Sequence, residues 1–130
     1  VQKVCDTFKP FQVSLDKPNY FGDSVLYLSV NSTNLLKLHQ KIINEISPSE
    51  DLIKQYFELD AFVPHLTLGK EKYGGNISTG LSKKELIEME KIADRELKPY
   101  PNFKVNFIRI YELNIEKQRY EKYLDISLSN

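Results

Sequence analysis

A chain of 130 residues with 41% hydrophobic and 28% charged residues has the size and composition of one compact domain, which excludes a disordered chain. The 18 basic and 18 acidic residues cancel and no apolar run reaches transmembrane length, so neither a general nucleic-acid binder nor a membrane protein is indicated. The single cysteine, Cys5, excludes a disulfide framework and a cysteine-rich zinc site, and it favours a reducing, cytoplasmic compartment.

The first half of the chain predicts a helix end, a β-hairpin and two further helices. Alternating apolar and polar residues indicate the first strand, and a run rich in strand-forming residues indicates the second. Turn-forming residues at 17–23 separate them. Ser32 or Thr33 is suited to cap the first of the two helices, and Ser47 the second. In chain order these elements are expected at residues 1–8, 11–15, 24–30, 33–46 and 48–59.

The second half predicts a strand, a helix and two more strands. A polar loop is expected over 70–80, and Ser82 with Glu85 forms the pattern of a capping box that opens the helix. The elements are expected at residues 61–69, 82–97, 103–113 and 120–128. The order α-β-β-α-α-β-α-β-β predicts an α+β fold, in which one antiparallel sheet carries helices on one face.

The segment around His65 combines residues suited to phosphate chemistry. On a strand His65 and Thr67 point to the same face, with Gly69 beside them, where it would leave room for a ligand. Leu66 and Leu68 then point to the opposite face, where a core is expected. A histidine moves protons near neutral pH, and a threonine hydroxyl donates to an anionic oxygen. A single histidine supplies one of two proton transfers, so one half-site implies a second.

The tripeptide His-x-Thr alone is a weak pattern, because most such histidines are ordinary polar groups at a sheet surface. Its surroundings are more specific. Pro64-His65-Leu66-Thr67-Leu68-Gly69 resembles the second signature of the 2H phosphoesterase superfamily, which includes the 2′-5′ RNA ligase-like proteins. The neighbouring elements also resemble that family in their order, at residues 10–30, 35–46, 105–113 and 120–128.

The resemblance implies a bilobal fold in which each lobe supplies one His-x-Thr strand to a central cleft. It implies a phosphodiesterase that needs no metal or other cofactor and acts on an RNA end or a small nucleotide phosphodiester, either a 2′,3′-cyclic phosphate or a 2′-5′ linkage. In such an enzyme one histidine is the general base, the other is the general acid, and the threonines hold the phosphate. His65 then takes one proton role, and Thr67 holds the phosphate. No obligatory protein partner is indicated.

The chain departs from the family pattern because it holds one His-x-Thr motif. The other histidine, His39, has no threonine two residues later and lies in an amphipathic helix, so we interpret it as structural. Because the family's first motif precedes the central hairpin, residues 1–130 are expected to form a single 2H-like domain that lacks its N-terminal segment. The alternatives are a lobe supplied by another segment, or a non-catalytic nucleotide- or RNA-binding module that retains one half-site.

Three further residues are candidates for binding substrate. Arg109 either contacts a phosphate or faces solvent from its strand. Lys70 either adds positive charge near the anion or is simply solvated. Tyr111 either stacks on a base or packs as tyrosines on strands do, and the loop over 71–78 either covers a ligand or is a variable surface loop. A protein-interaction domain and a metal hydrolase are weaker alternatives, the latter because no cluster of carboxylates accompanies the two separated histidines.

Overall fold

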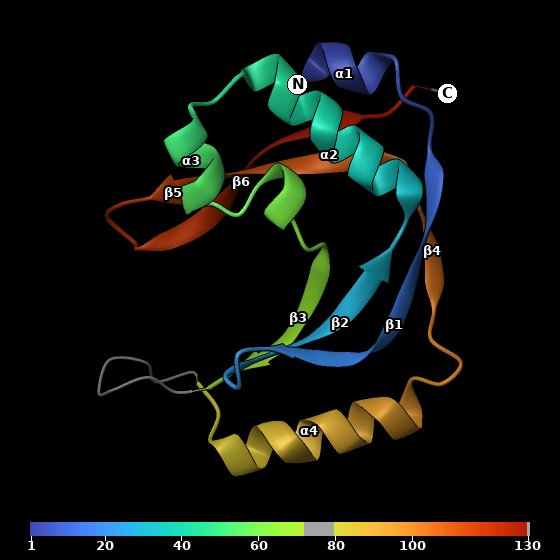
Figure 1. Cartoon of the computed structure of the whole chain (residues 1–130), viewed down its shortest axis with the longest axis vertical. Helices are drawn as coiled ribbons and strands as arrows, with labels where there is room; N and C mark the ends of the chain where they lie inside the picture. Colours follow the sequence, from blue (N-terminus) through green and yellow to red (C-terminus); the bar gives the residue numbers. More distant parts are fainter. Residues whose placement is uncertain (72–79, 130) are drawn as a thin grey trace. The chain divides into compact units, whose positions relative to one another are not determined.

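The computed structural model describes residues 1–71 and 80–129, and it confirms the α+β class (Figure 1). The helices are α1 (Gln2–Asp6), α2 (Thr33–Ile46), α3 (Glu50–Gln55) and α4 (Lys83–Glu96), and a 3₁₀ turn lies at Leu59–Ala61. The strands are β1 (Phe11–Phe21), β2 (Val25–Asn31), β3 (His65–Lys70), β4 (Asn102–Val105), β5 (Phe107–Asn114) and β6 (Arg119–Ser127). The expected loop over 71–78 lies, from residue 72 on, outside the described residues.

The strands form two sheets, so the expectation of a single sheet was wrong. A four-stranded sheet has the order β3-β2-β1-β4, and β5 pairs with β6 in a second sheet. The pairs β1–β2, β2–β3 and β5–β6 are antiparallel, as predicted. The predicted strand over 103–113 is interrupted at Asn106, whose carbonyl oxygen accepts a hydrogen bond from the Leu128 N–H at 2.9 Å. This break separates β4 from β5 and therefore the two sheets.

The chain divides into two compact units. Unit 1 comprises Val1–Val13, Ser32–Phe62 and Phe103–Asn130, and unit 2 comprises Ser14–Asn31 and Val63–Asn102. In unit 1, α1 packs against α2 and β6, and the buried side chains of that core include Val4, Cys5, Leu38, Ile126 and Leu128. In the part of the chain that the structure describes, no helix is long and apolar enough to span a membrane.

The helix caps of unit 1 agree in part with the prediction. Ser32 caps α2, because its hydroxyl accepts a hydrogen bond from the Leu35 N–H at 3.1 Å. The cap of α3 is Ser49 and not the expected Ser47. Ser47 instead ends α2: its φ of 49° is left-handed, and its N–H donates to Ile43. A residue that closes one helix in this conformation cannot also have the extended backbone of an N-cap.

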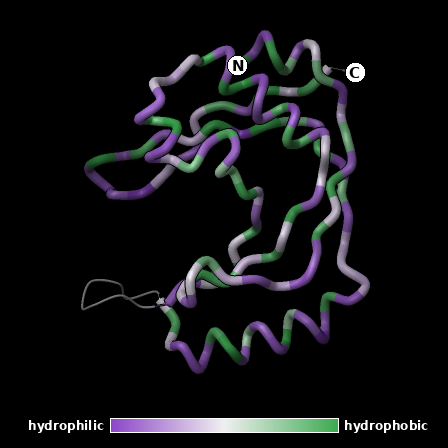
Figure 2. The backbone as a smooth tube through the Cα atoms, in the orientation of Figure 1, coloured by the Kyte–Doolittle hydropathy of each residue, from purple (hydrophilic) through white to green (hydrophobic). Residues whose placement is uncertain are grey.

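Unit 2 is a sheet of β1, β2 and β3 residues with α4 along one face (Figure 1). Hydrophobic and hydrophilic residues alternate along α4 (Figure 2), and Leu86 on this helix is completely buried, as is Leu26 on β2. The predicted capping box is present: the Ser82 hydroxyl accepts from the Glu85 N–H, and the Glu85 carboxylate accepts from the Ser82 N–H. The sheet and helix thus form a core that holds β3 in place.

Two strand boundaries in unit 2 differ from the prediction. The turn expected over 17–23 is mostly strand, because β1 continues to Phe21. Pro18 is accommodated in the strand by a register shift between Leu15 and Pro18. The turn shrinks to three residues that begin at Gly22, whose φ is 59°. The strand expected over 61–69 begins only at His65, since Pro64 has no N–H to give to the ladder.

Candidate active site

The sheet of unit 2 has one face covered by α4 and one face without that helix. Directly opposed residues of antiparallel strands point to the same face. Thr67 lies opposite Tyr27, and His65 lies opposite Ser29. Tyr27 is in turn opposite Asn19 of β1. The face that these pairs define, called the His65 face below, carries Asn19, Phe21, Tyr27, Ser29, His65, Thr67 and Lys70.

His65 is exposed at the first position of β3, and its ring is oriented by the backbone. Nδ1 of His65 lies 2.7 Å from the carbonyl oxygen of Val63. A carbonyl can only accept, so Nδ1 carries a proton and donates it. In the neutral ring Nε2 then holds the lone pair, and in the protonated ring it holds the second proton. Nε2 is therefore the atom of His65 that can take a proton from a substrate or give one to it.

Two aromatic rings hold the imidazole of His65 from the side. The rings of Phe21 and Tyr27 stack on each other with centroids 4.1 Å apart. The imidazole stands edge-to-face against both, at 4.9 Å from Phe21 and 5.7 Å from Tyr27. Tyr27 is itself buried, so this stacked pair of rings is part of the packed sheet. These aromatics are not predicted as site residues from the sequence, because their proximity to His65 depends on the register of three strands.

Thr67 and Lys70 complete the part of the His65 face that belongs to β3. Both side chains are exposed. Among the described residues, the Thr67 hydroxyl has no hydrogen-bond partner and the Lys70 ammonium has no ion pair. A proton donor and a cation on one open face suit an anionic ligand.

A bulge in β3 corrects the predicted position of Gly69. Leu26 lies opposite Gly69 while Tyr27 lies opposite Thr67, so Leu68 is an extra residue without an opposed partner. The bulge reverses the alternation of faces after Thr67. Gly69 consequently points toward α4 and away from the His65 face, and the extra residue brings Lys70 onto that face instead.

Contacts with α4 show why residue 69 is a glycine. A Cβ atom at this position would lie 3.0 Å from a methyl group of Leu81, 3.1 Å from the sulfur of Met89 and 3.2 Å from a methyl group of Leu86. The space beside Gly69 is therefore filled by protein and leaves no room for a ligand. Leu66 lies opposite the buried Leu28, on the face predicted for it, but it is 41% exposed because β3 is an edge strand of its sheet.

The other two predicted binding residues, Arg109 and Tyr111, lie on β5 in unit 1 and are not part of the His65 face. Arg109 donates from Nε and Nη2 to the Asp125 carboxylate, at 2.8 and 3.1 Å. This pairing raises the pKa of Arg109, with a smaller contribution from Tyr111, and lowers the pKa of Asp125 to about 2. Tyr111 is 56% exposed. Arg109 thus already has a carboxylate partner, whereas the ring of Tyr111 is accessible.

His39 has the structural role predicted from the sequence. Its ring stacks on Phe62 with centroids 3.7 Å apart, and its Nε2 accepts a hydrogen bond from the Leu59 N–H at 3.1 Å. Burial lowers the pKa of His39, and the nearby Glu58 carboxylate partly offsets that effect. His39 therefore holds the 3₁₀ turn against α2. Among residues 1–71 and 80–129, no three His, Cys, Asp or Glu side chains gather as metal ligands would.

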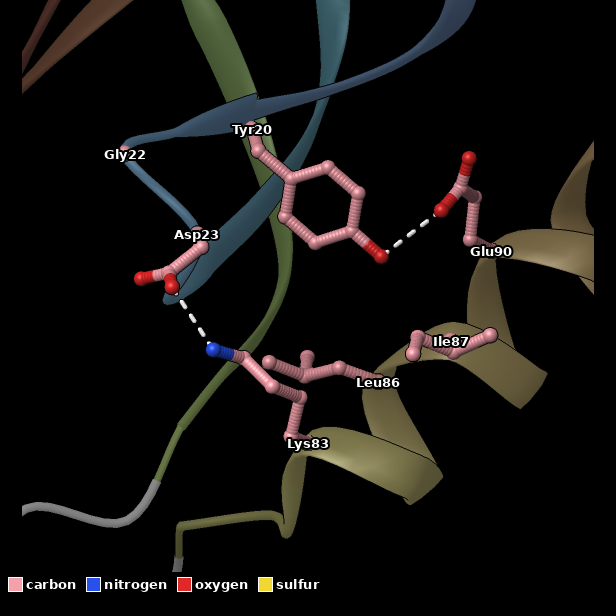
Figure 3. Close-up of a pocket in the computed structure, with 7 residues that line it drawn as sticks. All are labelled: Tyr20, Gly22, Asp23, Lys83, Leu86, Ile87 and Glu90. Carbon is pink, nitrogen blue, oxygen red and sulfur yellow. Dashed lines mark hydrogen bonds and ion pairs between the residues drawn. The ribbon is translucent and has the colours of Figure 1, made fainter.

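A pocket of about 210 Å³ lies on the other side of the sheet, between the end of β1 and α4 (Figure 3). Its polar groups are paired with each other. The Tyr20 hydroxyl donates to Glu90 at 2.7 Å, and Lys83 contacts Asp23 at 2.6 Å. Burial, followed by the bond to Glu90, raises the pKa of Tyr20 to about 12. These pairs fasten α4 to the sheet, and none of the predicted site residues lines the pocket.

Comparison with known proteins identifies the family of the chain. A family model described as the 2'-5' RNA ligase superfamily matches residues 1–112. The chain belongs to the 2'-5' RNA ligase superfamily. This membership confirms the resemblance to the 2H phosphoesterases, and the match includes the whole His65 face as well as Arg109 and Tyr111. None of the curated proteins compared with the chain matches it.

Proposed function

We propose that this member of the 2'-5' RNA ligase superfamily is a metal-independent phosphodiesterase that acts on RNA-derived or nucleotide phosphodiesters. The substrates are a 2′,3′-cyclic phosphate or a 2′-5′ linkage. One observation supports the proposal above the others: the Val63 carbonyl leaves Nε2 of His65 available for proton transfer, beside a threonine hydroxyl on the same face of the sheet. Family membership makes a phosphodiester the natural substrate for that pair.

The proposal assigns a role to each residue of the site. His65 transfers one proton through Nε2, either from the attacking water or to the leaving ribose oxygen. Thr67 donates its hydroxyl proton to a non-bridging phosphate oxygen, and Lys70 adds positive charge beside it. Arg109 and Tyr111 remain proposed substrate contacts of unit 1. For Arg109 to bind a phosphate, it has to share or exchange the bonds that it makes to Asp125.

The test is turnover of 2′,3′-cyclic AMP and of a 2′-5′-linked adenosine dinucleotide. The reactions contain EDTA, and chromatography measures the products. We expect His65→Ala to lower kcat/KM by about 10²-fold or more, because a positioned acid or base contributes about 10²–10⁴-fold. His65 is exposed, so the variant should keep the thermal midpoint of the wild type. The matched control is His39→Gln, which changes the other histidine and keeps a hydrogen-bond acceptor. Turnover by His65→Ala at the wild-type rate would contradict the proposal.

A second candidate is a non-catalytic nucleotide- or RNA-binding module. It is favoured by the fact that the 130 residues hold one His-x-Thr motif, while the only other histidine is engaged by Leu59 and Phe62. In-line displacement at phosphorus needs proton transfers on opposite sides, and a single imidazole serves one side. Nucleotide binding measured by calorimetry, without any turnover of either substrate, would support this candidate against the enzyme.

A further inference from the structure

A serine and an asparagine lie together on the His65 face, beside the proposed catalytic pair. Ser29 of β2 is directly opposed to His65, and Asn19 of β1 is opposed to Tyr27. The Nδ2 amide of Asn19 donates to the Ser29 hydroxyl oxygen at 2.8 Å. Both side chains are half-buried and come from paired strands of unit 2. Their positions relative to His65 are therefore set by the sheet and not by a loop.

The bond from Asn19 decides what the Ser29 hydroxyl can do. A serine hydroxyl has one proton and two lone pairs. Asn19 occupies a lone pair, so the proton of Ser29 is left to be donated elsewhere. Within the described part of the chain, the Ser29 hydroxyl oxygen has no second partner. An acceptor that approaches the open side of the His65 face would take this proton.

We propose that Ser29 is a further phosphate-binding residue and that Asn19 is the positioning residue that orients it. The inference rests on the proposed function, because it takes the anion bound at His65 and Thr67 to be a phosphoryl group. A phosphodiester has two non-bridging oxygens. Thr67 of β3 donates to one and Ser29 of β2 to the other, while Nε2 of His65 exchanges its proton with an ester or water oxygen.

Two donors on adjacent strands would fix the phosphoryl group more firmly than one. Ser29 is directly opposed to His65, with Cβ atoms about 4.5–5.5 Å apart, and it is the diagonal neighbour of Thr67, at about 7–8 Å. A phosphoryl group that accepts one hydrogen bond from each hydroxyl can bridge this diagonal span. A single hydrogen bond leaves the phosphorus free to turn about it. A second bond restricts that rotation and so holds the reacting oxygen near Nε2.

Binding of inorganic phosphate, measured by ³¹P NMR titration, tests the inference separately from turnover. We expect Ser29→Ala to raise the Kd for phosphate about tenfold, because a hydrogen bond to a charged oxygen is lost. Ser29→Thr keeps the hydroxyl and should restore binding to within about threefold of the wild type. The matched control is Ser14→Ala, which removes an exposed hydroxyl from β1 in the same unit and should bind as the wild type does.

A double-mutant cycle tests the role of Asn19. We expect Asn19→Ala to weaken phosphate binding when Ser29 is present and to have no further effect in the Ser29→Ala background. A merely structural role for Asn19 predicts a different pattern, in which the two effects add and the thermal midpoint falls. If Ser29→Ala does not fold, Asn19→Ala decides the matter alone, and a wild-type phosphate affinity for that variant overturns the inference.

The outcomes separate this inference from the proposed function. An unchanged phosphate affinity of Ser29→Ala overturns the inference even if turnover depends on His65, and so does a wild-type protein that binds no phosphate. Phosphate binding that depends on Ser29, in a protein that turns over neither nucleotide, supports the inference and contradicts the catalytic function. Binding that depends on Ser29 together with turnover that depends on His65 supports both.

Discussion

Thr67 is held differently from His65, although the two side chains lie on the same face of β3. The His65 ring is restrained by the Val63 carbonyl and by two aromatic rings. The Thr67 hydroxyl is exposed and has no partner among the described residues, and within that part of the chain the strand is what restrains the side chain. Its β-branched shape limits the rotation about χ1, which partly compensates for the missing contacts. The hydroxyl is therefore available to a ligand, and its loss should affect function without affecting stability.

Substitution of Thr67 by valine tests this residue. Valine keeps the β-branched shape and removes only the hydroxyl, so we expect an unchanged thermal midpoint. The kcat/KM for 2′,3′-cyclic AMP should fall about 10- to 100-fold, because a hydrogen bond to a charged group contributes about 1.5–3 kcal/mol. Thr67→Ser keeps the hydroxyl and should retain most of the activity. Loss of activity in the serine variant but not in the valine variant would show that the methyl group, and not the hydroxyl, is what matters.

The element that decides the composition of the site is β3, through the bulge at Leu68. An unbulged strand would place Gly69 with His65 and Thr67, and Lys70 on the opposite face. The bulge exchanges these two positions, so that the strand presents a cation to the ligand side and a residue without a side chain to α4. The packing is close at this point because Leu86 and Met89 of α4, and Leu81 just before it, occupy the space that a side chain would need.

Gly69→Ala should therefore destabilise the protein without impairing the site. Overpacking costs about 1–3 kcal/mol, and alanine recovers about 0.5–1 kcal/mol of backbone entropy in a strand, so we expect a net loss of about 1 kcal/mol in the free energy of unfolding. Urea titration measures this loss, and the cost should shrink in a Met89→Ala background, where the sulfur no longer opposes the new methyl group. The opposite result, lower kcat/KM at unchanged stability, would mean that Gly69 faces the ligand after all.

At the scale of the whole molecule, each compact unit has its own core, and the family match at residues 1–112 includes parts of both. The pH dependence of unfolding reports on unit 1 through His39. Because burial lowers the pKa of His39 in the folded state, the unfolded chain binds more protons below the ordinary value of 6.5. The resulting stabilisation is complete above that value and is lost as the pH falls through the folded-state pKa.

We accordingly expect the free energy of unfolding to decrease from about pH 7.5 to about pH 5.5, a window above the ordinary pKa of the carboxylates. His39→Gln removes the titrating group and should flatten this slope. Glu58→Gln removes the charge that partly offsets burial, so it should make the slope steeper. Urea titrations at several pH values, monitored by circular dichroism, give the free energy of unfolding of the wild type and of both variants. A His39→Gln slope equal to that of the wild type would contradict this account.

Local sequence signals were enough to predict α2 and α4, the hairpin of β1 and β2, and the location of His65 and Thr67 on the same face of their strand. Caps such as Ser32 and Ser82, and the alternation of apolar residues, act between neighbours in the chain, so they can be read without knowledge of the fold. The cap of α3 was misplaced because Ser47 and Ser49 are both suitable caps, and the closure of the preceding helix decides between them.

The surroundings of His65 were decided by tertiary structure. Phe21, Tyr27 and Ser29 lie 36 to 44 residues before His65 in the sequence, and they reach it only because three strands pair in one register. The positions of Gly69 and Lys70 depend on a single bulged residue, and a shift of one residue moves every later side chain to the other face. Register is fixed by contacts between distant strands and with α4, and no local pattern in β3 records it. The motif is thus a property of the sequence, whereas the site around it is a property of the fold.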